Sequence, residues 1–250
     1  MKTKQSTILA AALTITISST SATTIFSHDF NGDSSDLNGA TTDLGSGTWA
    51  SSTVFNQDGS IDPNSGSATL AFTPSSGTVY RLDVSLREVS GNGNWFALGF
   101  GAGQSTATGS GNRFINGQLI GKSWMLFRGN GDGHQAFRGS ATSGTENGSS
   151  WSALGTVTGD IDLRIELDTS GGATNWATTW LAKLPADASY TEVRSTEILL
   201  DETINSVGLA LAGNTVDGTV TSFSLTTIPE PSSLTLLALS ALGLVNRRRK

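Results

Sequence analysis

Strict alternation of apolar and charged residues is the feature that most limits what this chain can fold into. In the segment 160–168 (DIDLRIELD), every second residue is aliphatic and the residues between are charged. The segment 79–89 (VYRLDVSLREV) follows the same period of two. This is the period of a half-buried strand, whereas a helix needs apolar residues three or four positions apart. Both segments therefore predict strands with one face in a hydrophobic core.

Other segments are apolar on both faces, as strands in the centre of a protein are. They are residues 94–101 (NWFALGFG) and 123–128 (SWMLFR), and we expect a second sheet to cover them. Segments 205–212 and 219–225 complete the set, and turn signals such as 129–133 (GNGDG) separate the strands. Many short strands with this spacing predict an all-β fold, an antiparallel sandwich or barrel.

The composition agrees with a β-protein. The chain of 250 residues holds 30 Gly, 34 Ser and 33 Thr, and 36% of its residues are hydrophobic. Glycine, serine and threonine are poor helix formers, so helical bundles and coiled coils are disfavoured. The chain has no cysteine, which excludes disulfides, thiolate metal sites and cysteine nucleophiles.

The N-terminus has the three parts of a secretory signal peptide. Lys2 and Lys4 form a basic start, residues 8–17 (ILAAALTITI) are mainly apolar, and residues 20–22 (TSA) are small. The sequence therefore predicts a signal helix within residues 1–22 that is removed on export. A buried N-terminal helix is the alternative, which the threonines and serines of this stretch disfavour.

The C-terminus joins a proline motif, an apolar stretch and a basic cluster. The 14 apolar-rich residues 232–245 (SSLTLLALSALGLV) would span about 21 Å as a helix, against a hydrocarbon core of about 30 Å. Such a short transmembrane helix crosses only where the bilayer thins or flanking residues snorkel. The basic end would stay on the cytoplasmic side. The flanking motif residues are Pro229, Glu230, Pro231, Arg247, Arg248 and Arg249.

This combination resembles the PEP-CTERM sorting signal of exported bacterial proteins. The resemblance implies processing by an exosortase, a membrane-embedded cysteine protease or transpeptidase. It also implies that the C-terminal helix anchors the protein in the membrane until processing moves it to the cell surface or extracellular matrix. An ordinary membrane anchor is the alternative, but it leaves Pro229–Pro231 unexplained. The chain thus divides into a signal peptide (1–22), a β-sandwich domain (23–228) and a sorting segment (229–250).

The basic residues at the two ends of the chain partly offset the negative charge of the domain between them. The whole chain has a formal net charge of −6. Six basic residues and one acidic residue belong to the ends, so nine basic and twenty acidic residues remain and the domain carries −11. This charge argues against nucleic acid or anionic lipid as a partner and is compatible with divalent cations.

The order of several short motifs resembles the concanavalin A-like, or laminin G-like, jelly roll. These motifs lie at residues 25–32 (IFSHDFNG), 37–39 (LNG), 47–49 (GTW), 95–100 (WFALGF) and 220–225 (VTSFSL). The resemblance implies an antiparallel sandwich whose last strand pairs near the first. The family includes lectins, carbohydrate-binding modules and glucanases, so the fold does not fix the function.

No catalytic motif is found. A glucanase of this fold would carry Glu-x-Asp-x-Glu on one strand, but segment 160–168 has Arg164 at its centre and matches only in part. His28 and His134 lack partner motifs, and no nucleophile elbow, zinc motif or phosphate loop occurs. We predict no catalytic residue. The alternative is a glycoside hydrolase with an unrecognised carboxylate pair about 5–10 Å apart.

Oxygen ligands on loops make calcium the best cofactor candidate. The first cluster of such residues comprises Asp29, Asn31, Asp33 and Asp36, and two smaller groups are Asp58 with Asp62 and Asn130 with Asp132. The alternative is that aspartate, asparagine and glycine simply form turns here.

Aromatic platforms would bind sugar, and six tryptophans are available. Trp151 follows a polar loop, and Trp176 would share a face with Trp180 if residues 175–181 form a strand. Trp151 and Trp176 are therefore the candidate ligand-binding residues, with core packing as the alternative. Together these features predict an exported, non-enzymatic structural or adhesive protein, with extracellular polysaccharide as its candidate ligand.

Overall fold

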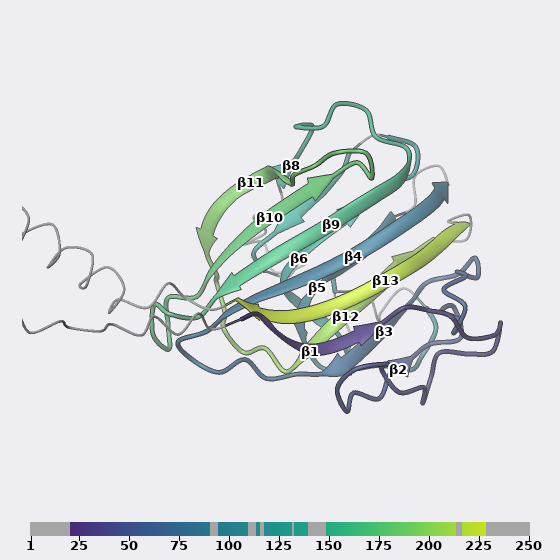
Figure 1. The fold of residues 1–250 in the computed structure, drawn as a ribbon, viewed down its shortest axis with the longest axis horizontal. Helices are drawn as coiled ribbons and strands as arrows, with labels where there is room; N and C mark the ends of the chain where they lie inside the picture. The colour runs from purple at the N-terminus through teal and green to yellow at the C-terminus, as the bar shows by residue number, and fades with distance from the viewer. Residues whose placement is uncertain are drawn as a thin grey trace, which may run out of the picture. The chain divides into compact units, whose positions relative to one another are not determined.

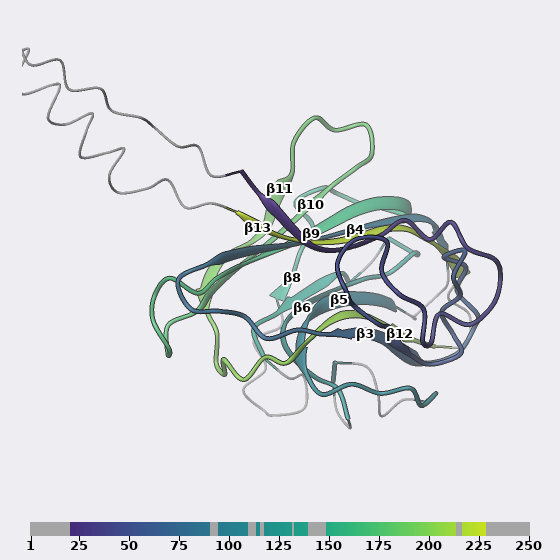
Figure 2. The ribbon, with the colours of Figure 1, turned by 60° about the horizontal axis from the view of Figure 1, so that its bottom comes forward.

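Two antiparallel sheets lie face to face (Figure 1, Figure 2). The computed structural model describes residues 21–90, 95–109, 114–115, 118–131, 133–139, 149–213 and 217–228. Within these ranges the chain forms thirteen strands and no helix. The all-β sandwich predicted from the sequence is confirmed.

The first sheet has six strands in the order β1-β13-β4-β9-β10-β11. Every neighbouring pair in it is antiparallel. The strands are β1 (Thr23–His28), β13 (Asp217–Ile228), β4 (Val79–Ser90), β9 (Gly159–Asp168), β10 (Ala177–Lys183) and β11 (Thr191–Ile198).

The second sheet has seven strands in the order β2-β3-β12-β5-β6-β7-β8, again antiparallel throughout. The strands are β2 (Ala50–Ser51), β3 (Gly66–Ala71), β12 (Ser206–Ala212), β5 (Trp95–Ala102), β6 (Ile120–Phe127), β7 (Gln135–Phe137) and β8 (Ser149–Ser150).

The alternating segments form the centre of the six-stranded sheet. Strands β4 and β9 pair in the register Leu82 with Ile165, and both side chains are fully buried between the sheets. Burial of each such aliphatic side chain contributes about 1.5–3 kcal/mol. Their charged neighbours in sequence lie on the opposite, outer face of the sheet because side chains alternate along a strand.

The segments that are apolar on both faces form the centre of the seven-stranded sheet. On β5, Phe96 and Leu98 point into the core between the sheets, as expected. Their neighbour Ala97 belongs to a second buried cluster, where Phe114 and Leu119 pack beside it. The six-stranded sheet therefore covers only one face of β5, and residues of the β5–β6 connection cover the other.

The first and last strands of the domain pair with each other, as the jelly-roll resemblance implied. Phe26 of β1 lies opposite Leu225 of β13, and Thr23 lies opposite Thr227. Residues Ala22–Ile228 form one compact unit, and the main core cluster runs from Phe26 to Leu225. A fragment of residues 22–228 thus contains every buried core residue that the structure describes.

The processing segments lie almost wholly outside the described residues. The signal helix, the transmembrane helix and the motif residues from Pro229 onward therefore stay predictions, as do the domain limits 1–22, 23–228 and 229–250. In the part of the chain that the structure describes, no helix is long and apolar enough to cross a membrane.

Candidate functional site

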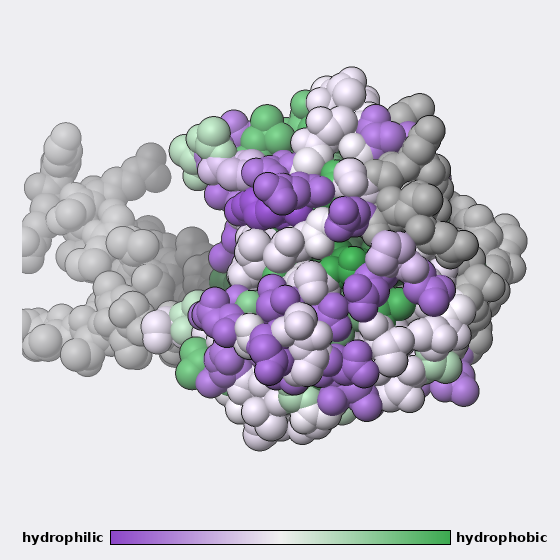
Figure 3. All heavy atoms as spheres, turned by 90° about the vertical axis from the view of Figure 1, so that its right-hand side faces the viewer, coloured by the Kyte–Doolittle hydropathy of each residue, from purple (hydrophilic) through white to green (hydrophobic). Residues whose placement is uncertain are grey.

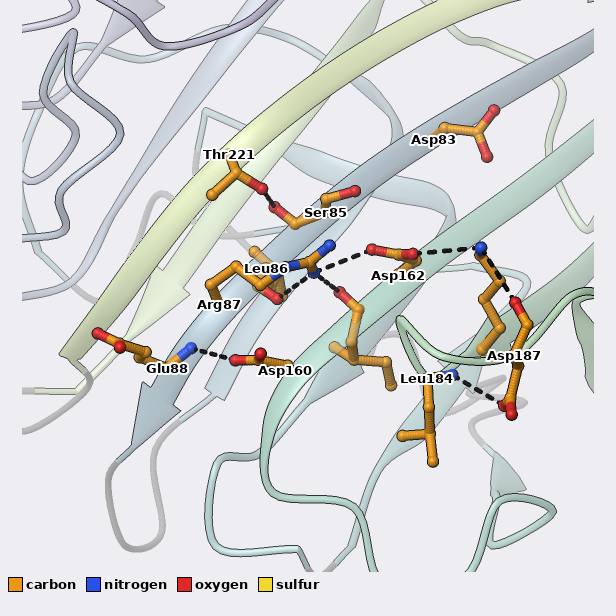
Figure 4. A network of polar contacts seen from close by, with 12 residues as sticks. Asp83, Ser85, Leu86, Arg87, Glu88, Asp160, Asp162, Leu184, Asp187 and Thr221 are labelled. Atoms are coloured by element: carbon orange, nitrogen blue, oxygen red, sulfur yellow. Dashed lines mark hydrogen bonds and ion pairs between the residues drawn. The ribbon is translucent and has the colours of Figure 1, made fainter.

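The carboxylates of β9, the closest approach to a catalytic motif, are held by basic side chains. Arg87 Nη1 donates to Asp162 Oδ1 at 2.9 Å, and Lys183 Nζ lies 3.5 Å from Asp162 Oδ2 (Figure 4). The Asp162 side chain is only 10% exposed, so both contacts are shielded from solvent on its side. One carboxylate thus lies between two cations from neighbouring strands.

The next carboxylates along this face are paired in the same way. Arg81 donates through Nε and Nη2 to Glu166 Oε1 at 3.0 and 2.9 Å. Arg164 Nε donates to Asp83 Oδ1 at 2.6 Å. Each pair lies directly opposite in the β4–β9 register, the arrangement in which cross-strand charges stabilise a sheet.

Tyr190, which precedes β11, packs on this network. Its ring centre lies 3.8 Å from the Arg164 guanidinium carbon, and its hydroxyl donates to Asp83 at 3.2 Å. Burial, followed by the charge of Asp83, raises the pKa of Tyr190, so the hydroxyl keeps its proton and remains a donor. The network is satisfied internally, which is typical of a structural surface.

The end of the network is shaped by a bulge in β4. Glu88 has a φ of 57°, and the register between β4 and β9 shifts from Leu86 to Val89. The Glu88 N–H donates to Asp160 Oδ1 at 2.8 Å, as Figure 4 shows. At the other end, Asp168 Oδ1 accepts from the N–H and the hydroxyl of Ser170. These two aspartates therefore serve local backbone structure.

The cavity of interest lies instead among the loops that follow β1, at the right-hand end of Figure 1. We call it the His28 pocket. Its volume is about 530 Å³, within the range of small-molecule sites. Figure 3 shows this end of the domain, where hydrophilic residues predominate and hydrophobic patches are small. The pocket is lined by His28, Asn31, Gly32, Gly39, Ala40, Thr41, Asp43 and Gln57.

His28 is the buried member of this lining. It is 7% exposed, because it follows the inward-facing Phe26 by two residues on β1. Its ring meets Phe30 and Trp49 edge to face, at centroid distances of 4.6 and 6.0 Å. Its Nδ1 has no hydrogen-bond partner among the described residues and lies 3.9 Å from Asp43 Oδ1. Loss of solvation lowers the pKa of His28 and outweighs the opposing effect of nearby carboxylates.

Asp43 is the charged member. Its side chain is half exposed, and its Oδ2 accepts the backbone N–H of Asp29 at 2.7 Å. Its own N–H donates to Ser27 O at 2.8 Å, which ties the loop to β1. The carboxylate therefore has a fixed position at the pocket.

Gln57 forms the opposite wall. The N–H of Gly32 donates to Gln57 O at 3.1 Å, and Gln57 Nε2 donates to Ser35 Oγ at 2.9 Å and to Asp36 O at 3.1 Å. A Cβ at Gly32 would lie 2.6 Å from the Gln57 Cβ, so only glycine permits this approach. The pocket walls are thus joined by direct hydrogen bonds, and the pocket is formed without a ligand.

The predicted calcium cluster is not assembled as one ligand set. Asn31 lines the His28 pocket, whereas Asp33 Oδ1 accepts from the N–H and hydroxyl of Ser35. The backbone of Asp36 bridges that of Asn56. Among the described residues, no three His, Asp or Glu side chains converge on one point. The residues present do not fit a preformed carboxylate site for calcium.

The smaller acidic groups also act in turns. Asp58 Oδ1 accepts from the N–H and hydroxyl of Ser60, and Asp62 Oδ2 accepts from Asn56. Of the third group, Asp132 lies outside the described residues.

Trp151 and Trp176 are not exposed platforms. They are 5% and 8% exposed and belong to the main core cluster. Trp151 stacks on the His134 ring at 4.5 Å, and Trp176 immediately precedes β10 and is buried with Trp180. Both side chains therefore pack in the core, which was the alternative to a ligand-binding role. No contact tests a ligand role for them.

The sequence did not predict the His28 pocket. It is built from three separate segments, residues 28–32, 39–43 and 57, which come together through loop hydrogen bonds. One signal was present, since His28 follows the inward-facing Phe26 on β1 and precedes the buried Phe30 by two residues. A polar side chain on an apolar face needs a special environment.

The C-terminal segment is similar to a known sorting motif. Residues 227–250 match the model of the PEP-CTERM protein-sorting motif. The chain carries a PEP-CTERM sorting motif. The predicted recognition of this motif is confirmed, and the matched segment begins at the end of β13. No curated protein matches the chain.

The sandwich itself is similar to solved jelly-roll structures. The metal-free exoplasmic/lumenal domain of VIP36 is 9% identical, with a TM-score of 0.51 over 84% of this chain and 94% of that one. The Ca2+/Man-bound form of VIP36 is 11% identical, with a TM-score of 0.50 over 80% and 88%. An endo-1,3-beta-glucanase from Streptomyces sioyaensis is 13% identical, with a TM-score of 0.48 over 87% and 100%. The likeness to VIP36 shows the fold of the domain alone.

Proposed function

We propose that this chain is an exported protein of the cell surface or extracellular matrix that binds carbohydrate without cleaving it. An exosortase processes it at the sorting segment, and the domain of residues 22–228 is the part that reaches its destination. Before processing, the C-terminal helix anchors the precursor in the membrane. The domain's excess of acidic residues disfavours nucleic acid as a partner.

The PEP-CTERM motif supports the export and sorting parts of this proposal. The predicted signal peptide supplies the other half of the route, because export must precede exosortase action. VIP36, which shares the fold, was solved in a Ca2+/Man-bound form, so the same sandwich is compatible with sugar binding. That form of VIP36 also holds Ca2+, so calcium is the metal ion to test on this chain.

The observation that carries the binding proposal is the His28 pocket. Sugars present hydroxyl groups that need hydrogen-bond acceptors and donors at fixed positions. The pocket offers the carboxylate of Asp43 and the amide-bearing residues Asn31 and Gln57. Because hydrogen bonds already fix its walls, little conformational entropy is lost on binding.

The ion pairs on β9 favour binding over hydrolysis. A retaining or inverting glycosidase needs one carboxylic acid to protonate the leaving group and a second, ionised carboxylate. On β9, Asp162 and Glu166 each contact a basic side chain, so neither carboxylate is free to act on a glycosidic bond.

Two assays on the 22–228 fragment test this proposal. Glycan-array binding measures recognition, and release of reducing ends from the bound polysaccharide measures hydrolysis. We expect binding to at least one extracellular polysaccharide and no release of reducing ends. Hydrolysis of a bound glycan would favour the glycoside hydrolase, and absence of binding to any glycan would favour a purely structural role.

Expression of the full chain with and without an exosortase tests the sorting part. We expect the C-terminal tail to be lost only when the enzyme is present, as measured by intact-protein mass spectrometry. Replacement of Pro229 and Glu230 by alanine should retain the tail. An unchanged processing of that variant would contradict exosortase recognition of the motif.

A further inference from the structure

The His28 pocket has an acidic lining. Asp43 lines it directly, and Asp29, whose N–H is bound to Asp43, follows His28 in sequence. The lining residues include no lysine or arginine, and neither aspartate contacts one in the part of the chain that the structure describes. The electrostatic potential of the pocket is therefore negative, and an anionic ligand is disfavoured.

The buried ring of His28 adds a second observation that points to a ligand. The side chain is more than nine-tenths buried and lines the pocket, yet its Nδ1 finds no hydrogen-bond partner within the ranges that the structure describes. The 3.9 Å to Asp43 Oδ1 is too long for a hydrogen bond. Buried polar atoms in native proteins are nearly always satisfied, so the buried Nδ1 needs a partner that a ligand can supply, and the half-exposed Asp43 carboxylate beside it accepts hydrogen bonds only.

Gln57 strengthens the preference for donors in the ligand. Its amide nitrogen already donates to Ser35 and Asp36, so its remaining capacity is that of an oxygen acceptor. Asp43 likewise accepts only. A ligand that complements these groups must donate hydrogen bonds, and a positive charge on that donor would balance the carboxylate.

We propose that the His28 pocket binds a sugar unit with a free, protonated amino group, and that the Asp43 carboxylate is the partner of that ammonium. The inference rests on the proposed carbohydrate binding and names the class of sugar for the same site. An ammonium offers three donors and a charge in one small group. A neutral hydroxyl offers one donor and no charge, so its hydrogen bond to the carboxylate is weaker.

A divalent cation is the competing ligand, and the geometry favours the amine. Calcium takes six to eight oxygen ligands. Asp33 and Asp58 are bound to neighbouring serines, and no three acidic or histidine side chains converge among the described residues. One carboxylate with amide and imidazole neighbours suits a single ammonium better.

Calorimetric titration of the 22–228 fragment tests the inference with three sugars. The probes are glucosamine with its amine protonated, N-acetylglucosamine and glucose. Because a hydrogen bond to a charged group is worth about 1.5–3 kcal/mol, we expect glucosamine to bind at least about tenfold more tightly than the two neutral sugars. Asp43→Asn should abolish this preference.

Asp33→Asn is the matched control. It removes the same charge from the same loop region, but Asp33 does not line the pocket. We expect it to keep the preference. Asparagine at position 43 retains an oxygen that accepts the Asp29 N–H, so the loop should keep its shape, and thermal unfolding checks this. On the unmodified fragment, glucosamine should shift the backbone amide NMR signals of Gly39, Thr41 and Asp43.

Four other outcomes would each contradict the inference, and they can be told apart. Equal binding of neutral sugars would leave the carbohydrate proposal standing and remove the amine preference. NMR shifts confined to another surface would move the site elsewhere. Binding of calcium alone at Asp43, with glucosamine excluded, would make the pocket a metal site. Failure of every sugar, including polysaccharides on the array, would overturn the proposed function as well.

Discussion

The outer face of the six-stranded sheet and the His28 pocket both present carboxylates, but the partners of these carboxylates differ. On the sheet, Asp83, Asp162 and Glu166 each contact an arginine on the neighbouring strand. In the pocket, Asp43 contacts a backbone N–H and the distant ring of His28. The carboxylates of the sheet are paired with basic side chains, whereas the pocket leaves the Asp43 carboxylate available to a ligand.

The difference follows from how each region is built. Residues on two paired strands lie opposite each other at a fixed register, so opposite charges can be matched position by position. A pocket made of three loop segments places backbone groups and single side chains around a space. This contrast separates a surface that stabilises the fold from one that can recognise a molecule.

Asp162→Ala should show the largest effect on stability. The change leaves Arg87 and Lys183 without their shared carboxylate in a shielded position. Loss of one partner of a buried pair costs about 3–5 kcal/mol, but Arg87 is 30% exposed, so we expect about 2 kcal/mol. Urea unfolding of the 22–228 fragment measures it.

Asp168→Ala removes a carboxylate from the same strand and serves as the comparison for Asp162→Ala. Asp168 accepts only from Ser170, and we expect a loss within about 0.5 kcal/mol. If the two alanine variants were equally stable, the ion pairs would not be what stabilises this face.

The Asp83–Arg164 pair should give a smaller, measurable coupling. Both side chains are about one-fifth exposed and lie opposite each other. A double-mutant cycle with Asp83→Asn and Arg164→Gln should yield about 1 kcal/mol of coupling in the free energy of unfolding. Strictly additive effects would mean that the pair contributes no mutual attraction.

His28 should make the stability of the pocket region depend on pH. Its pKa in the folded protein lies below the ordinary value of 6.5, so the unfolded chain binds the proton more readily. The stability should therefore be complete above about pH 6.5 and decline as the pH falls through and below this value. Urea unfolding at a series of pH values measures the decline.

His28→Phe keeps a ring against Phe30 and Trp49 and removes the titrating group. Its stability should fall less than that of the wild type between about pH 7 and pH 5. Identical pH profiles for the two proteins would show that His28 does not titrate differently in the folded state.

Calcium should have the smallest effect. Since no carboxylate trio converges within the described ranges, we expect removal of calcium by a chelator to change the melting temperature of the 22–228 fragment by less than about 1 °C. A larger fall, restored by added calcium, would revive the predicted site at Asp29, Asn31, Asp33 and Asp36.

The sheet was predictable from the sequence and the pocket was not. The alternation of 160–168 predicted β9 and its charged outer face, because a strand's period of two assigns each side chain to a face. The pairing of β1 with β13 followed from the family resemblance. These are properties of regular backbone, which a sequence pattern encodes directly.

The tryptophans and the pocket show where such patterns fail. Trp176 shares a face with Thr178 and Trp180, as alternation predicts, but the pattern did not tell that this face points into the core. The pocket depends on contacts such as that between Gly32 and Gln57, which are 25 positions apart and belong to no regular element. Long-range loop contacts leave no period in the sequence.

Parallel calorimetric titrations of Asp43→Asn and Glu166→Gln with glucosamine test the central claim most directly. Each variant removes one carboxylate charge, the first from the pocket and the second from the ion-paired sheet. We predict that Asp43→Asn lowers the affinity at least about tenfold and that Glu166→Gln leaves it unchanged. Loss of binding in Glu166→Gln with normal binding in Asp43→Asn would contradict the account, because it would place recognition on the sheet and leave the pocket without a role.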